Sequence, residues 1–246
     1  MKKKAVIIVT PNLPDHDKLP GATMDADAWK SFLISPEGGA WKDEEINVMS
    51  DTSKEIIELT LNLHKLMNLD YALIAFSGHG HYKILPDRNT ETRMFISKDD
   101  YLTEHTLTVR AKRELVVMDA CRQYGGEVIE ETTKMAHFAN RETILAEDRF
   151  AKAREAYEKA LVLSPEGRTL IYSCTLNQAA ADKLSFTRFL ISDAERLARE
   201  CRYFKTISVK EAFDVAQVKT FTNNYPQQPT FDGGRRSTHF PFSVSL

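Results

Sequence analysis

The chain has 246 residues, which is enough to bury a full hydrophobic core in one domain. Apolar residues make up 42% and charged residues 28%, with only 10 Gly and 9 Pro, and this composition excludes a disordered or fibrous chain. The formal net charge of -2 comes from 33 basic and 35 acidic residues, so no global field draws the chain to nucleic acid or to an anionic membrane.

The amino terminus is basic and then apolar, with Lys2 to Lys4 followed by the run AVIIV at 5–9. This run is too short for the apolar part of a signal peptide, and no small-residue cleavage site follows, so we interpret it as a first strand. No apolar stretch approaches the roughly 20 residues of a membrane-spanning helix. The sequence therefore predicts a cytoplasmic protein with no membrane partner, in which the three cysteines are free thiols.

Strand and helix patterns alternate along the chain. Runs of apolar and β-branched residues predict buried strands at 5–9, 46–49, 71–77, 114–118 and 169–174. Helical spacing of apolar residues predicts helices at 25–34, 52–67, 185–200 and 208–219. Thr52 with Glu55, and Ser208 with Glu211, match the capping box that begins a helix. The alternation predicts an α/β protein with a doubly wound, mostly parallel sheet.

One segment interrupts this alternation. Residues 127–168 are highly charged and have helical spacing from Arg149 to Leu163. We interpret the segment as a largely helical insertion within a single domain that spans 1–246. Residues 223–236 are rich in turn-forming residues and predict a loop before a last strand at 240–244.

Two of the predicted strands end in residues that can perform chemistry. His79 lies between two glycines just after the third strand, and Cys121 lies just after the fourth. Because the carboxyl ends of neighbouring parallel strands meet at one edge of a sheet, we expect these two side chains to lie close together. A thiol attacks a carbonyl as thiolate, and an imidazole can take its proton and later protonate the leaving amine. The pair predicts a nucleophile, Cys121, with His79 as acid–base partner.

Other interpretations of single residues remain open. Cys174 and Cys201 follow the common pattern of buried core cysteines. His81 is a second candidate for the acid–base role. An alternative role for Asp25 is to cap the helix that follows, and an alternative role for Gly78 and Gly80 is to form a tight turn. The remaining histidines have no ligand spacing and are expected to be surface or core residues: His16, His64, His105, His137 and His239. No zinc or calcium pattern is present, so we expect no metal and no cofactor.

The ordered set of motifs resembles the caspase-like cysteine peptidases, which include caspases, metacaspases and paracaspases. The resemblance is carried by GATMDA at 21–26, FSGHG at 76–80, VMDACR at 117–122, YSCTLNQAA at 172–180, FTRFL at 186–190 and YPQQP at 225–229. It implies a three-layer α-β-α fold with a central sheet of about six strands and helices on both faces. It also implies that His79 and Cys121 form the catalytic dyad, with the backbone N–H groups of Gly80 and Cys121 around the developing oxyanion.

The resemblance also implies a specificity. Caspases that cut after aspartate have a neutral glutamine two residues before the nucleophile, whereas metacaspase-like members have an acidic residue, and this chain has Asp119 there. The resemblance to metacaspases places Asp25 in the same P1 pocket. Two carboxylates facing one guanidinium would give charge-assisted recognition, which predicts cleavage of protein substrates after Arg in preference to Lys.

Caspase-like enzymes are often zymogens, and bacterial relatives often act in defence or signalling systems. By this resemblance, basic residues in the insertion are candidate sites for processing by the enzyme itself or by an upstream protease: Lys134, Arg141, Arg149, Lys152 and Arg154. A regulatory protein is a second route to activation. The alternative is that the charged helical insertion is merely solvated.

Three other function classes compete with a peptidase. A catalytically silent caspase-like scaffold would only bind partner proteins, and the presence of both His79 and Cys121 argues against it. A nucleotide-binding protein would need a glycine-rich phosphate loop after the first strand, and the sequence has none. A nucleic-acid-binding module is disfavoured by the charge balance.

Overall fold

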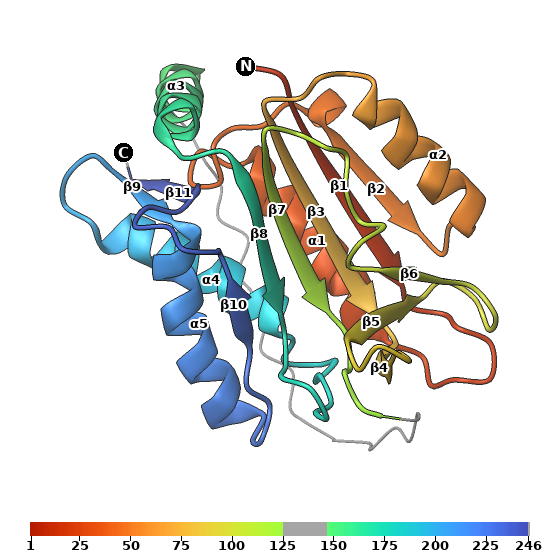
Figure 1. The fold of residues 1–246 in the computed structure, drawn as a ribbon. Coiled ribbons are helices and arrows are strands. Elements are labelled where there is room, and N and C mark those ends of the chain that lie inside the picture. The colour runs from red at the N-terminus through yellow and green to blue at the C-terminus, as the bar shows by residue number, and fades with distance from the viewer. Residues whose placement is uncertain (125–146, 246) are drawn as a thin grey trace.

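A six-stranded sheet forms the centre of the computed structural model, which describes residues 1–124 and 147–245 (Figure 1). The strand order is β10-β8-β7-β3-β1-β2. The strands are β1 Lys3–Thr10, β2 Ile46–Ser50, β3 Tyr71–Gly78, β7 Arg113–Asp119, β8 Gly167–Tyr172 and β10 Thr230–Asp232. All neighbours pair in parallel except β10, which is antiparallel to β8. The predicted mostly parallel sheet of about six strands is confirmed.

Helices cover both faces of the sheet, which confirms the expected three layers (Figure 1). Four of them, α1 Pro20–Ile34, α3 Glu147–Leu163, α4 Phe186–Glu200 and α5 Val209–Asn223, contribute to one hydrophobic core. That core contains large, fully buried side chains such as Trp29, Tyr157 and Phe186. On the other face, α2 Lys54–Lys65 buries Ile57 and Leu61. In the described part of the chain, no helix combines the length and the apolar composition that crossing a bilayer requires.

The two predicted helix caps have different outcomes. At α5 the Ser208 hydroxyl accepts a hydrogen bond from the Glu211 N–H, and the Glu211 carboxylate accepts one from the Ser208 N–H, so the predicted capping box is confirmed. The predicted box of Thr52 and Glu55 is wrong, because α2 begins at Lys54 with Ser53 in the cap position. The Thr52 hydroxyl instead donates to the Ser50 carbonyl oxygen at the end of β2.

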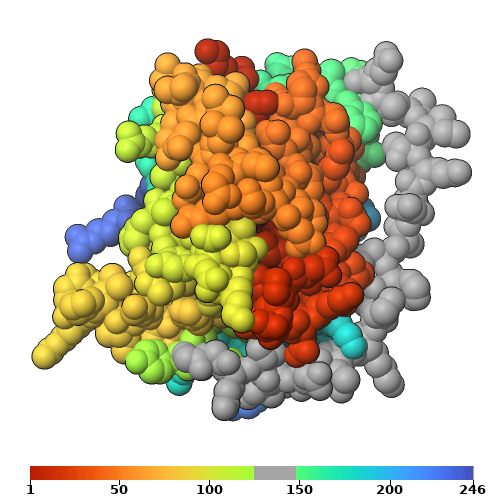
Figure 2. All heavy atoms as spheres, turned by 90° about the vertical axis from the view of Figure 1, so that its right-hand side faces the viewer, coloured from red at the N-terminus to blue at the C-terminus, as the bar shows by residue number. Residues whose placement is uncertain are grey.

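Two small antiparallel sheets add to the central one, and the sequence analysis predicted neither. The first consists of β4 Gly80–Ile84, β5 Thr90–Phe95 and β6 Tyr101–Thr103, directly after β3. Figure 2 shows its β4–β5 turn, in yellow, projecting from the body of the molecule. The second joins β9 Lys205–Ser208 to β11 Pro241–Ser245. The last predicted strand therefore exists, but it belongs to this second sheet.

The segment predicted as a turn-rich loop at 223–236 contains an edge strand. Residues Thr230–Asp232 form β10, which pairs with β8 from Leu170 to Tyr172. This correction has a physical reason: a strand of three residues at a sheet edge is too short to show an alternating pattern, and its pairing depends on a distant segment.

The described part of the charged segment 127–168 packs against the protein body. In α3 the side chains of Ala153, Tyr157 and Leu161 are buried, while Arg154 pairs with Glu45 at 2.6 Å. β8 begins at Gly167, so the end of the segment belongs to the central sheet.

Candidate active site

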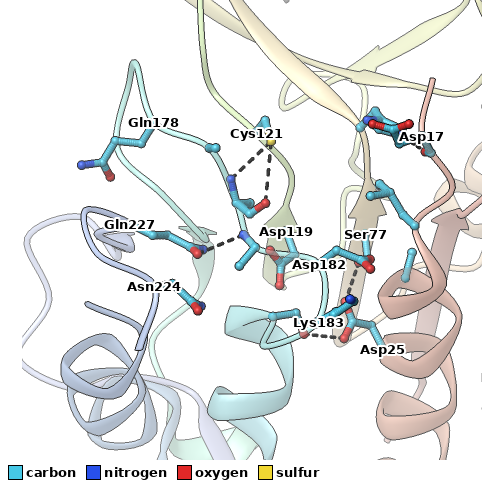
Figure 3. Close-up of a pocket in the computed structure, with 18 of the residues that line it drawn as sticks. Asp17, Asp25, Ser77, Asp119, Cys121, Gln178, Asp182, Lys183, Asn224 and Gln227 are labelled. Atoms are coloured by element: carbon cyan, nitrogen blue, oxygen red, sulfur yellow. Dashed lines mark hydrogen bonds between the residues drawn. The ribbon is translucent and has the colours of Figure 1, made fainter. Parts of the chain in front are cut away.

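The register of β3 and β7 places His79 and Cys121 at the same edge of the sheet. Ser77 pairs with Asp119 at the carboxyl ends of these strands, and His79 and Cys121 each follow two positions later. Both side chains line one cavity of about 530 Å³, and Figure 3 shows Cys121 in it. The structure thus brings the two predicted catalytic side chains into one site.

Gly80 lies against the segment that carries Cys121. A Cβ atom at position 80 would lie 2.9 Å from the Ala120 Cβ and from the Arg93 carbonyl oxygen, and 3.0 Å from the Cys121 carbonyl oxygen. Real side chains do not fit so closely, so the close approach of the histidine loop to the cysteine loop requires glycine here.

Replacing Gly80 by alanine is therefore expected to lower kcat/KM about 100-fold, because the added methyl group pushes His79 and Cys121 apart. A matched control is Gly234→Ala. Gly234 has φ +64° but no atoms within 4 Å of its Cβ direction, so alanine there costs about 1–2 kcal/mol of stability through the backbone alone. Steady-state kinetics and thermal unfolding of both variants test the difference. Equal activity of the two variants would contradict the close contact at Gly80.

The His79 ring is fixed by the loop between β1 and α1. Its Nε2 lies 2.8 Å from the Asp17 carbonyl oxygen. Because a carbonyl oxygen only accepts, Nε2 carries the hydrogen and Nδ1 is left as an acceptor. Burial lowers the pKa of His79, partly offset by the bond to Asp17, which favours a neutral imidazole. Such a ring can act as a base.

Two other histidines lie near this ring. His16 packs on His79 with a centroid distance of 4.9 Å, a contact that was not predicted, since His16 was expected to be a surface or core residue. His81 lies on β4 and packs on Phe95 at 4.8 Å, and it is not among the residues that line the cavity. The geometry therefore favours His79 over His81 as acid–base residue.

The Cys121 thiol is held by the loop between β8 and α4. The Ala180 N–H donates to Sγ at 3.3 Å, and Sγ lies 3.8 Å from the Ala180 carbonyl oxygen (Figure 3). Burial raises the pKa of Cys121, and the negative charge of Asp119 adds to this effect while the Ala180 N–H opposes it. Within the part of the chain that the structure describes, no hydrogen bond joins Sγ to the His79 ring. Because its pKa is raised, the thiol is protonated at neutral pH, and in this arrangement it contacts Ala180.

The same loop is anchored on both sides of the cavity. The Ala181 N–H donates to the Gln227 side-chain oxygen at 3.0 Å (Figure 3). At the other end, the Asp182 carbonyl oxygen lies only 2.0 Å from where a Cβ of Gly21 would be, at the start of α1. Glycine at position 21 thus lets the loop approach α1. The loop crosses the site from Cys121 to this helix.

The structure also brings the two predicted P1-pocket carboxylates into the cavity. Asp119, at the end of β7, accepts a hydrogen bond from the Thr187 N–H at 2.8 Å. Asp25 accepts from the hydroxyls of Ser77 at 2.6 Å and Ser185 at 2.5 Å. Both side chains are buried, and burial raises the pKa of each.

The position and the partner of Asp25 differ from the expectations drawn from the sequence. It is not a helix cap, because α1 begins at Pro20 with Leu19 in the cap position and Asp25 lies inside the helix. Its carboxylate already has a partner in the chain, since Arg188 Nε lies 3.2 Å from Oδ1. The sequence analysis gave Arg188 no role in this pocket.

Comparison with known proteins defines the family. A family model described as a caspase domain matches residues 2–237. The chain belongs to the caspase-domain family of cysteine peptidases. Among solved structures, caspase-1 from Spodoptera frugiperda superposes with a TM-score of 0.60 at 13% identity, covering 99% of this chain and 90% of that one. At this identity the likeness shows a shared fold. No curated protein matches the sequence.

The candidate processing sites of this caspase domain fall into two groups. Lys134 and Arg141 lie outside the described residues. Arg149, Lys152 and Arg154 lie in helix α3, where each forms an ion pair. Proteolytic nicking prefers exposed loops, so a cut in α3 would require the helix to unfold locally.

No metal centre is apparent in the caspase domain. Across residues 1–124 and 147–245, no three or more His, Cys, Asp or Glu side chains are grouped so that they could hold a metal ion.

Proposed function

We propose that the chain is a cysteine endopeptidase that cleaves after basic residues, with Arg preferred to Lys. The supporting observation is that one cavity contains a thiol, an imidazole with a free Nδ1, and two buried carboxylates. A cationic P1 side chain that enters toward Asp119 would place its scissile carbonyl near Cys121, two residues further along the same segment. The scaffold alternative has no comparable use for this combination.

The proposed reaction uses these groups in order. The Cys121 thiol transfers its proton to His79 Nδ1 as Sγ attacks the scissile carbonyl carbon. The resulting oxyanion is stabilised by the backbone N–H groups of Gly80 and Cys121, a contribution of about 2.7–4 kcal/mol for each such donor. The intermediate collapses to a thioester, and the leaving amine takes the proton from His79. Water then attacks the thioester with His79 as base, which releases the acid and restores the thiol.

Catalysis requires a change from this arrangement. The Cys121 thiol must exchange its contact with Ala180 for one with His79. Processing near Lys134 or Arg141, or binding of a regulatory protein, would be the signal for this exchange. The chain is on this proposal a zymogen or a partner-activated enzyme.

Profiling a peptide library tests the proposal. Wild-type protein is expected to cleave after Arg and more slowly after Lys, and Cys121→Ala is expected to cleave nothing. A peptidyl-Arg electrophile should modify Cys121, as located by mass spectrometry. If the wild-type chain neither cleaves nor reacts, even after limited trypsin treatment to mimic processing, the scaffold alternative is correct.

A further inference from the structure

Arg188 is a buried cation directly behind the carboxylate of Asp25. Its side chain is 7% exposed, and its Nε lies 3.2 Å from the Asp25 Oδ1 and 3.0 Å from the Ser185 hydroxyl. Another guanidinium nitrogen donates to the Asp182 carbonyl oxygen. Asp25 lines the cavity, whereas Arg188 does not. A substrate that enters the cavity would therefore contact an Asp25 carboxylate that is already paired with Arg188.

The two carboxylates differ in their charged partners. Asp25 accepts from Ser77 and Ser185 and forms an ion pair with Arg188. Asp119 accepts from the Thr187 N–H, and the hydroxyls of Thr187 and Ser173 also favour its ionised form, but among the described residues it forms no ion pair. A P1 arginine needs a carboxylate that is not already paired with a cation, so Asp119 is the better acceptor.

The charges of these three groups define what the pocket can bind. The charge of Asp119 opposes ionisation of Asp25, whereas Arg188 favours the ionised form of both carboxylates. With both carboxylates ionised, the cluster has a net charge of one negative unit, because arginine stays protonated. A buried site is stable only when its charges are compensated, and one P1 cation completes the balance.

We infer that Arg188 sets P1 selectivity by cancelling one of the two pocket carboxylates, so that the cavity presents a single net negative charge at Asp119. This inference rests on the proposed peptidase function and deepens it. Arg188 acts through Asp25 and does not contact substrate, so it is a positioning residue. Asp25 is the counter-ion of Arg188 and does not itself bind the P1 side chain.

A set of charge variants tests this inference with paired substrates that differ only at P1, arginine or its neutral isostere citrulline. The readout is the Arg-to-citrulline ratio of kcat/KM at about pH 9, in which common effects on the dyad cancel. Asp25→Asn leaves Arg188 to neutralise Asp119, so the ratio should fall about 100-fold. The double variant Asp25→Asn with Arg188→Met removes both charges and should return the ratio to within about threefold of wild type.

Direct contact between Asp25 and the P1 guanidinium predicts a different result. The double variant would then have an Arg-to-citrulline ratio as low as that of Asp25→Asn, and the inference would be overturned. It is also overturned if Asp25→Asn leaves the ratio unchanged. If Asp25→Asn does not fold, the double variant is compared directly with wild type: the inference expects the two ratios to agree within about threefold, and direct contact expects the double variant to be much worse. Arg199→Met, at an exposed ion pair on the same helix, is the matched control.

The pH dependence of the same ratio gives an independent readout. The charged groups that face Asp25 are Asp119 on β7 and Arg188 on α4, and Asp182 and Lys183 line the same cavity. Burial, followed by the charge of Asp119, raises the pKa of Asp25 to about 8. Below this pH Asp25 is protonated, and because burial also raises the pKa of Asp119 the cluster then has no net negative charge. The ratio should therefore rise as pH increases through about 8 in wild type and stay flat in the double variant, and a flat wild-type profile counts against the inference.

These results separate the inference from the proposed function. If wild-type protein does not cleave after Arg in any activated form, the proposed function is wrong, because the charge variants then have no activity whose P1 selectivity could be measured. If wild type cleaves after Arg and the double variant is as poor as Asp25→Asn, only the role of Arg188 has failed.

Discussion

Replacing His79 by alanine is expected to lower kcat about 10⁴-fold, close to the effect of removing the Cys121 thiol. The two groups act as one unit, so loss of either removes most of the advantage of the pair. The effect should be large here because burial raises the pKa of Cys121, which leaves the thiol protonated without a base. Single-turnover assays with an Arg-P1 peptide measure the loss.

The matched control for this prediction is His81→Ala. His81 lies two residues away on β4, packs on Phe95 and does not line the cavity, so its loss should change kcat by less than about fivefold. The dyad assignment fails if His79→Ala retains a tenth or more of wild-type activity, or if His81→Ala is the more damaging substitution.

The middle of the central sheet was predictable because its strands are buried on both faces. The strands β3 Tyr71–Gly78 and β7 Arg113–Asp119 are buried at every position, and they contain the unbroken apolar runs 71–76 and 115–118. The ends of these runs also located His79 and Cys121. The shorter strands β4, β6 and β10 are partly exposed, and their pairing partners determine them more than their own residues do.

The environment of the candidate site was only partly predictable. Motif resemblance indicated Asp25 and Asp119, but the ion pair between Asp25 and Arg188 joins residues 163 positions apart. No local sequence pattern predicts such a contact. Arg188 follows Phe186 and Thr187 in the first turn of α4, and all three side chains are buried. A buried arginine needs an anionic partner, and the carboxylates nearest the predicted cysteine were the available ones.

The resting position of Cys121 lay beyond sequence analysis for a different reason. The motif around residue 121 is the same whether its thiol faces His79 or Ala180. In the structure, backbone atoms of Ala180, in the loop between β8 and α4, supply both contacts of the thiol. Backbone groups are common to all residues, so they leave no signature in the sequence.

Replacing Asp119 by asparagine is expected to lower kcat/KM for an Arg-P1 peptide by about 10³-fold. Asparagine keeps an oxygen that can accept from the Thr187 N–H, so the strand end stays in place. It removes the negative charge, and a P1 guanidinium would then be buried beside Arg188 with no uncompensated anion. Kinetics with Arg-P1 and citrulline-P1 peptides should show that the loss is confined to the cationic substrate.

A second measurement on Asp119→Asn distinguishes a damaged pocket from a damaged fold. The charge of Asp119 contributes to raising the pKa of Cys121, so its removal lowers the pKa of that thiol and increases the thiolate fraction at neutral pH. Alkylation of Cys121 by iodoacetamide should therefore become faster in the variant that has lost peptidase activity. Asp17→Asn, which removes a charge from the same cavity but keeps the carbonyl that holds His79, should change kcat/KM only severalfold. Slower alkylation of Asp119→Asn, or equal losses in both variants, would show that Asp119 does not act through its charge in the P1 pocket.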